Sequence, residues 1–256
     1  MSGIEWVKAR LAETVAAFAL LTRLPVGLIP VPWTRELRRA AWAYPLVGAA
    51  VGLIGGLTYW VLNILGVPPV LAAIFAIFAT ILATGALHED GLVDAADGLG
   101  GKSPEDRLAI MRDHRIGTYG AIALVLSLGI RIAAIALLAE PALVIGALIA
   151  SGAASRACAT ALMAALPHAR DDGMSIAAGR ASTGYAVTAF ALAFAIAWFV
   201  LSFVSAFGVI LVSLIATAIV GLLARARLGG QTGDVLGASC QITECATLTA
   251  ITVASA

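Results

Sequence analysis

Residues 69–87 read PVLAAIFAIFATILATGAL and contain no charged side chain, whereas residues 88–98, HEDGLVDAADG, carry four carboxylates. An apolar helix of about 20 residues is long enough to cross a hydrocarbon core roughly 30 Å thick. The first stretch is therefore predicted to span a membrane, and the acidic stretch is predicted to lie where the span ends. This junction indicates both the fold class and the place of the chemistry.

The composition agrees with a membrane protein. The chain has 256 residues, of which 61% are hydrophobic and 12% are charged, against about 25% charged residues in soluble domains. We predict an all-α integral membrane protein with one transmembrane helical domain, residues 1–256, embedded in a lipid bilayer. The net charge is only +1, and the chain has no basic patch, so nucleic acid is not expected as a partner.

Five further apolar runs are long enough to span the bilayer: 41–65, 118–138, 142–166, 184–205 and 208–224. Residues 4–22 are interpreted as an interfacial helix or a marginal span, and residues 241–256 are apolar but short for a crossing. These segments predict a polytopic bundle of about six to eight transmembrane helices. Within 41–65, Gly48, Gly52 and Gly56 repeat at a spacing that predicts close packing against another helix.

Four longer polar segments alternate with pairs of spans, which places them all on one side: 22–40, 86–117, 167–183 and 225–240. They hold twelve of the sixteen basic residues, while the tight links 66–68, 139–141 and 206–207 hold none. The positive-inside rule predicts that this polar face is cytoplasmic.

The acidic segment carries the strongest functional signal. If it is helical, Asp90, Asp94 and Asp97 share one face. Like charges in such a row repel each other, so we expect a divalent cation and a phosphate-bearing substrate among them. Glu89 lies off that face, which leaves a supporting role, a general-base role or exposure to solvent, and His88 is more typical of a hydrogen-bonding residue than of a metal ligand.

Other polar segments supply candidate phosphate ligands. Lys102 follows a glycine-rich turn whose backbone N–H groups suit phosphate oxygens, although a flexible loop explains the same composition. Arg112 and Arg115 flank Asp113 and are suited to clamp a diphosphate while Asp113 helps to hold a metal. A basic anchor at the membrane edge with a local salt bridge is the alternative.

Two arginines interrupt apolar runs. Arg156 lies near the middle of its span and is expected to face a polar cavity or an acidic partner, whereas Arg131 is expected only to extend toward the membrane surface. After the last span, Thr232, Asp234 and Glu244 are expected to add hydroxyl and carboxylate groups to the polar face, unless that segment is only a structural turn.

Together these motifs resemble the cobalamin synthase family, the adenosylcobinamide-GDP ribazoletransferases. The resemblance covers nearly the whole chain in the expected order. It is carried by five segments: His88-x-Asp90-Gly91-x-x-Asp94-x-x-Asp97-Gly98, IMRDHRIG (110–117), RLGGQTGDVLG (227–237), LTRLP (21–25) and YPLVG (44–48). Glu89 and His114 occupy positions that often hold an apolar residue and a serine in the family.

The resemblance implies a multi-pass enzyme of the cell inner membrane. It would join adenosylcobinamide-GDP to α-ribazole, or to its 5′-phosphate, and release GMP with Mg²⁺ as cofactor. Asp90, Asp94 and Asp97 would hold the metal together with Asp113, and Glu89 or Asp97 would act as general base on a ribose hydroxyl. Charge on the leaving GMP would be stabilised by Arg112, Arg115 and Lys102, and the expected substrate contacts are His88, Lys102, Arg23, Arg156, Thr232 and Asp234.

Two other functions fit parts of the pattern. A CDP-alcohol phosphotransferase also uses aspartates on membrane helices, but its motif has an Ala-Arg pair after the first Asp-Gly, which is missing here. A secondary transporter would place ion-coupling acids at mid-membrane, whereas these acids cluster at one edge. Whether the protein forms a homo-oligomer is left open by the sequence.

Overall fold

The computed structural model describes residues 3–28, 37–113 and 115–255, and their regular structure is helical. Within these ranges the one β-type pairing is an isolated bridge between His168 and Gln231. The long helices are α1 (Gly3–Leu21), α2 (Tyr44–Ile64), α3 (Pro69–Thr84), α6 (Thr118–Leu138), α7 (Pro141–Ala165), α9 (Thr183–Val200), α10 (Phe203–Leu228) and α11 (Gly233–Ser255). The short ones are α4 (Leu87–Gly98), α5 (Pro104–Ile110), α8 (Met174–Ala178) and the 3-10 turns Val26–Leu28 and Leu37–Ala43.

Five helical segments in the described ranges are long and apolar enough to cross a membrane, and α3 with α4 makes a sixth if that bent pair is one span. The prediction of a helical membrane protein is confirmed, and six spans, the lower end of the expected number, are reached only if this bent pair counts as a span. α1 and α11 do not belong to this set. α11 has the length to cross, but it carries Asp234 and Glu244.

One predicted boundary is wrong. The link between the last two spans lies at Leu201 and Ser202, and not at residues 206–207. The Ser202 hydroxyl accepts a hydrogen bond from the Ser205 amide at 3.1 Å, so it caps α10. Helix α10 therefore starts earlier than hydropathy alone indicates, and it continues to Leu228.

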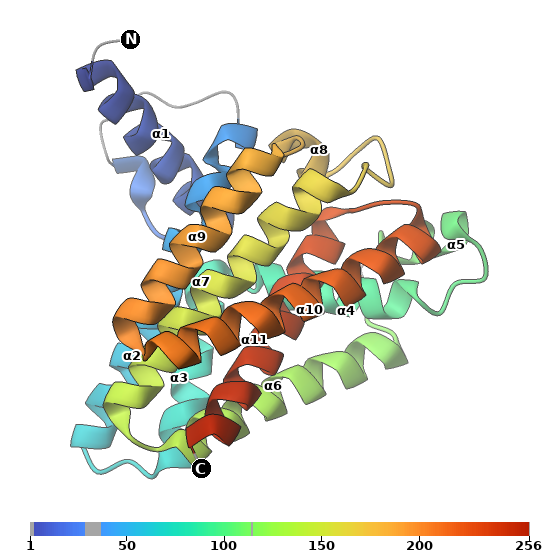
Figure 1. Cartoon of the computed structure of the whole chain (residues 1–256). Helices are drawn as coiled ribbons and strands as arrows, with labels where there is room; N and C mark the ends of the chain where they lie inside the picture. Colours follow the sequence, from blue (N-terminus) through green and yellow to red (C-terminus); the bar gives the residue numbers. More distant parts are fainter. Residues whose placement is uncertain (1–2, 29–36, 114, 256) are drawn as a thin grey trace.

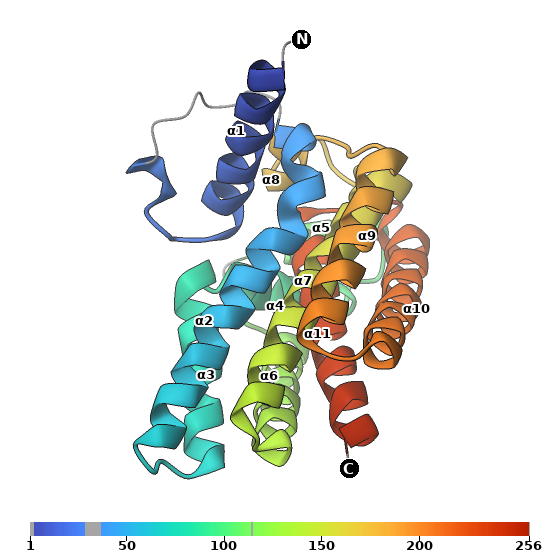
Figure 2. The same cartoon turned by 60° about the vertical axis from the view of Figure 1, so that its left-hand side comes forward.

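Helix α7 is the central element, with α2 and α9 packed along it (Figure 1, Figure 2). The predicted glycine contact is confirmed on α2. A Cβ atom added to Gly48 would lie 1.9 Å from the Gly152 carbonyl oxygen, and one added to Gly52 would lie 2.2 Å from that of Leu148. The two backbones touch at these positions, which requires residues without side chains.

The opposite ends of the molecule carry different elements. Helix α1 lies at one end, and the C-terminal end of α11 lies at the other end in both views (Figure 1, Figure 2). Helix α4 lies between α6 and α11 and packs on both. The acidic segment is thus held against two long helices and does not project freely from the bundle.

Candidate functional site

A sharp bend after α3 positions the acidic helix. Gly85 adopts the left-handed conformation (φ +66°) and ends α3, and α4 then departs at 90°. A Cβ atom added to Gly85 would lie 2.6 Å from Nε of Arg23, so Arg23 packs on the bend. Glu89 and Asp90 fall in the first turn of α4, where the helix dipole favours negative charge.

Two glycines bring α4 and α11 close together. A Cβ atom added to Gly91 would lie 2.9 Å from the carbonyl oxygen of Asp234, and one added to Gly237 would lie 3.3 Å from Cα of Gly91. This contact places Asp90 on α4 beside Asp234 on α11. Residues that are more than 140 positions apart in the sequence therefore form one acidic surface.

Asp90 and Asp234 belong to a cleft of about 590 Å³, which we call the charged cleft. Its walls come from α4, from the segment between α5 and α6, from the loop after α7 and from the start of α11. The charged residues that line it are Glu89, Asp90, Asp94, Arg112, Asp113, Arg115, Arg170, Asp172 and Asp234. Three of the four predicted polar segments thus meet at one site.

Ion pairs link the arginines of the cleft to its carboxylates. Arg112 donates to both carboxylate oxygens of Asp172, at 2.8 and 3.0 Å, and Arg115 donates to Asp113 at 2.6 Å. Arg170 lies 3.3 Å from Asp234. The first two pairs are solvent-exposed, and such pairs contribute only about 0–1 kcal/mol, so a phosphate group can take over these arginines at little cost.

The cleft shifts the pKa values of two of its carboxyls in opposite directions. The hydrogen bond from Arg112 lowers the pKa of Asp172 below its ordinary value,. Burial raises the pKa of Asp234, and the neighbouring Asp90 raises it further, although Arg170 and the Thr232 hydroxyl act against this. Asp172 is thus a carboxylate over a wider pH range, while Asp234 takes up a proton more readily.

The predicted metal ligands do not all line the charged cleft. Asp90 and Asp94 line the charged cleft, as does Asp113, but Asp97 is not among the lining residues. Its two carboxylate oxygens accept the backbone N–H groups of Gly117 and Gly120, each at 2.8 Å. Asp97 therefore caps the N-terminus of α6, where a carboxylate satisfies free amides and the helix dipole.

In the described ranges, no group of three His, Cys, Asp or Glu side chains is arranged to hold a metal ion by itself.

The predicted substrate contacts are also spread over several places. Lys102 is exposed and lines neither this cleft nor the cavities next to it. Thr232 is fully buried and accepts the Val235 amide at 3.2 Å, so it caps α11. His88 lines a neighbouring pocket and not the cleft.

Glu89 and Arg156 belong to a buried ion cluster that we define as Glu89, Arg131, Arg156 and Glu244. Arg131 lies 3.1 Å from Glu89 and 3.2 Å from Glu244, and Arg156 pairs with the other oxygen of Glu244. The expectation that Arg131 extends toward the membrane surface is wrong, because its side chain is 1% exposed. The expected acidic partner of Arg156 is Glu244, and Glu89 also borders the charged cleft.

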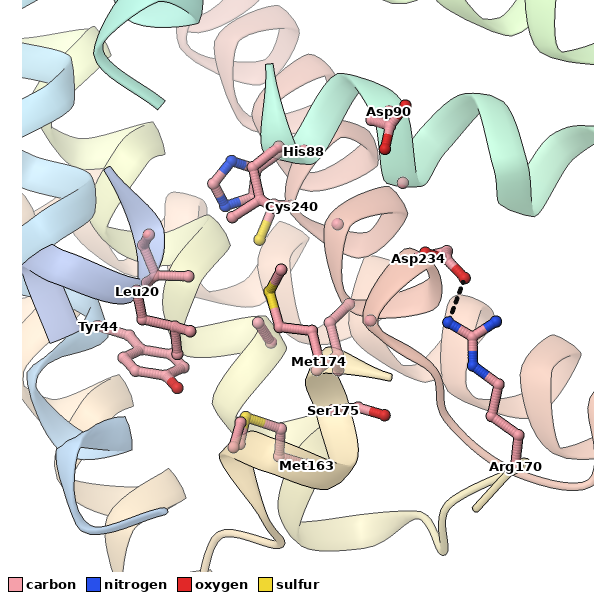
Figure 3. A pocket seen from close by; sticks show the side chains of 18 residues that line it. Leu20, Tyr44, His88, Asp90, Met163, Arg170, Met174, Ser175, Asp234 and Cys240 are labelled. Atoms are coloured by element: carbon pink, nitrogen blue, oxygen red, sulfur yellow. Dashed lines mark ion pairs between the residues drawn. The ribbon is translucent and has the colours of Figure 1, made fainter. Parts of the chain in front are cut away.

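A second cavity, the apolar pocket, opens beside the cleft and shares Asp90, Arg170 and Asp234 with it. Figure 3 shows the Arg170–Asp234 ion pair at one side of this pocket and apolar side chains such as Leu20 and Met163 at the other. The sequence interpretation missed Arg170 and Asp172 as site residues. The run Arg-Asp-Asp-Gly at 170–173 is the signal in the sequence from which both residues could have been found.

Comparison with known proteins gives a consistent result. The profile of the family described as cobalamin-5-phosphate synthase matches residues 13–252. The adenosylcobinamide-GDP ribazoletransferase of Bradyrhizobium diazoefficiens is 47% identical over 92% of this chain and 91% of its own length. The protein of the same name from Mesorhizobium japonicum is 41% identical over 95% and 94%. No solved structure matches the chain.

Proposed function

This chain belongs to the cobalamin-5-phosphate synthase family, and we propose that its adenosylcobinamide-GDP ribazoletransferase reaction takes place in the charged cleft. Membership of this family supports this activity and argues against a CDP-alcohol phosphotransferase and against a transporter. One observation supports this location. The arginines and the aspartates that the reaction needs line the same cleft: Arg112, Arg115, Arg170, Asp90 and Asp94.

The arginines suit the diphosphate of adenosylcobinamide-GDP. A guanidinium matches two phosphate oxygens at once, and the exposed partners Asp172 and Asp113 are readily exchanged for such oxygens. Arg112 and Arg115 would hold the GMP portion and stabilise the charge that develops on it as it leaves. Lys102 would have to reach the cleft from the exposed turn before α5, so we assign it a weaker role.

Mg²⁺ fits the carboxylates of this site. Mg²⁺ keeps several water molecules and typically binds through one or two carboxylates together with substrate phosphates. Asp90 and Asp94 lie one helical turn apart on α4 and supply such a pair, and Asp113 lines the same cleft. When bound, the ion would neutralise phosphate charge that the aspartates alone would repel.

The transfer itself requires a proton acceptor. A ribose hydroxyl of α-ribazole would form a bond to the phosphorus attached to cobinamide, the bond from that phosphorus to GMP would break, and the hydroxyl proton would pass to a carboxylate. Asp234 is the best placed, because it lies where the cleft meets the apolar pocket. Asp97 is held by two amides and Glu89 by Arg131 and Gln241, which makes both less suited.

We also propose that the enzyme is a multi-pass protein of the cell inner membrane and that the cleft opens to the cytoplasm. The support is the concentration of basic residues in the polar segments that build the cleft. To test this, a tag is placed in the cleft-side loop near Asp171, and spheroplasts are treated with a membrane-impermeant reagent that labels the tag. Labelling from outside intact spheroplasts would contradict it.

The test of the site is GMP release from adenosylcobinamide-GDP, measured on purified protein with and without α-ribazole and Mg²⁺. Chelation of Mg²⁺ should abolish release, and Asp94→Asn should lower kcat by about 100-fold or more. Asp171→Asn is the matched control, because Asp171 is exposed on a cleft-side loop but does not line the cleft. Near-normal turnover of the Asp94 variant would contradict the proposed role of this carboxylate.

A further inference from the structure

Three buried polar side chains have an unpaired atom in the same place. Tyr44, His88 and Ser175 are 3%, 3% and 2% exposed. In the described part of the chain, no hydrogen-bond partner exists for the Tyr44 hydroxyl, the His88 Nδ1 atom or the Ser175 hydroxyl. All three residues line the apolar pocket (Figure 3).

Buried polar atoms of native proteins are nearly always paired, because an unpaired one loses its bonds to water without replacement. A single exception is common. Three exceptions among the uncharged side chains of one cavity, contributed by α2, α4 and α8, add to two nitrogens of Arg170 that also have no hydrogen-bond partner among the described residues. Together they indicate that the cavity normally receives a ligand that supplies the missing partners.

The remaining walls define the chemistry of that ligand. They are largely apolar and include Leu20, Met163, Met174 and Leu236. The pocket has a volume of about 130 Å³, close to the roughly 150 Å³ of an engineered apolar cavity that binds benzene. It therefore holds about one six-membered ring, and a bicyclic base would extend toward the charged cleft, to which Asp90, Arg170 and Asp234 connect the pocket.

We propose that the apolar pocket binds the base of the ribazole acceptor and thereby selects a nucleoside with a flat, apolar bicyclic base. This proposal rests on the proposed function of the charged cleft. Ribazole carries a dimethylated benzimidazole, whose sugar-free ring nitrogen accepts one hydrogen bond. The Tyr44 and Ser175 hydroxyls and His88 are the candidate donors for this nitrogen and for the adjoining sugar, and the ribose hydroxyl is directed toward Asp234.

Tyr44→Phe tests this proposal with the smallest change. The hydroxyl has no partner among the described residues, so its loss should leave the thermal midpoint unchanged or slightly higher. The KM for α-ribazole should rise by about three- to ten-fold, the effect of one lost hydrogen bond, while the KM for adenosylcobinamide-GDP stays the same.

Tyr59→Phe is the matched control. Tyr59 lies on the same helix and is also fully buried, but its hydroxyl donates to the Ala139 carbonyl at 3.0 Å, and it does not line the pocket. This variant should lose stability and keep both KM values. An unchanged KM for α-ribazole in Tyr44→Phe would overturn the proposal.

Ala178→Leu gives an independent test, because Ala178 lines the pocket and is 5% exposed. The added side chain should weaken binding of 5,6-dimethylbenzimidazole, measured directly by calorimetry on the purified enzyme, by at least ten-fold. Equal binding in the variant and the parent protein would place the base elsewhere. If the parent protein itself releases no GMP, the proposed function is contradicted instead. The failure of this proposal and the failure of the proposed function are therefore distinguishable.

Discussion

Glu244 is the carboxylate that two buried arginines share. It lies 3.2 Å from Arg131 and pairs with Arg156 through its other oxygen, while Glu89 lies 3.1 Å from the other terminal nitrogen of Arg131. The cluster contains two positive and two negative side chains. Its burial is tolerable only because these charges balance.

Glu244→Gln removes one negative charge and leaves an excess positive charge among side chains that are 1% and 3% exposed. Breaking one partner of a buried ion pair costs about 3–5 kcal/mol. With about 2–4 °C per kcal/mol for a chain of this size, the midpoint of thermal unfolding in detergent should fall by roughly 6–20 °C.

A second substitution separates charge balance from packing. Arg156→Met added to Glu244→Gln leaves Glu89 paired with Arg131, so much of the lost stability should return. Asp171→Asn, which changes an exposed carboxylate on the loop after α7, should not move the midpoint. The reasoning is refuted if Glu244→Gln alone stays within about 1 kcal/mol of the parent, or if the double variant loses the sum of the two single effects.

Three further substitutions, one of them with a matched control, test the fold around the site by thermal unfolding. Asp97→Ala should cost about 1–2 kcal/mol, because two backbone amides at the N-terminal end of α6 lose their acceptor,; an unchanged midpoint would refute the capping role. Gly52→Ala should cost about 1–3 kcal/mol or more, because its Cβ would meet the Leu148 carbonyl at 2.2 Å,, whereas Gly208→Ala, with open space around it, should be neutral or slightly stabilising. Ser202→Ala should cost about 1 kcal/mol through the lost cap of α10,, and no change would indicate that water replaces the hydroxyl.

Much of the architecture follows from local properties of the sequence. The length of the uncharged runs predicts membrane-spanning helices, because backbone polar groups in lipid must be paired within the helix. The spacing of Gly48 and Gly52 predicts a close helix contact, because residues without side chains on one face let two backbones approach each other. The spacing of Asp90 and Asp94 predicts a shared face on α4, and both residues line the charged cleft.

The partners of the charged groups depend on helices that are distant in sequence. Asp97 has the periodicity of a cleft residue, yet it caps α6, because the end of that helix lies next to it. Hydropathy cannot show that Arg131 is compensated by Glu89 and Glu244, which lie 42 and 113 residues away. The periodicity of a sequence shows which side of a helix a residue occupies. Only the packing of the bundle determines which side chains face that side, and the energy of a buried charge depends on the charge of those neighbours.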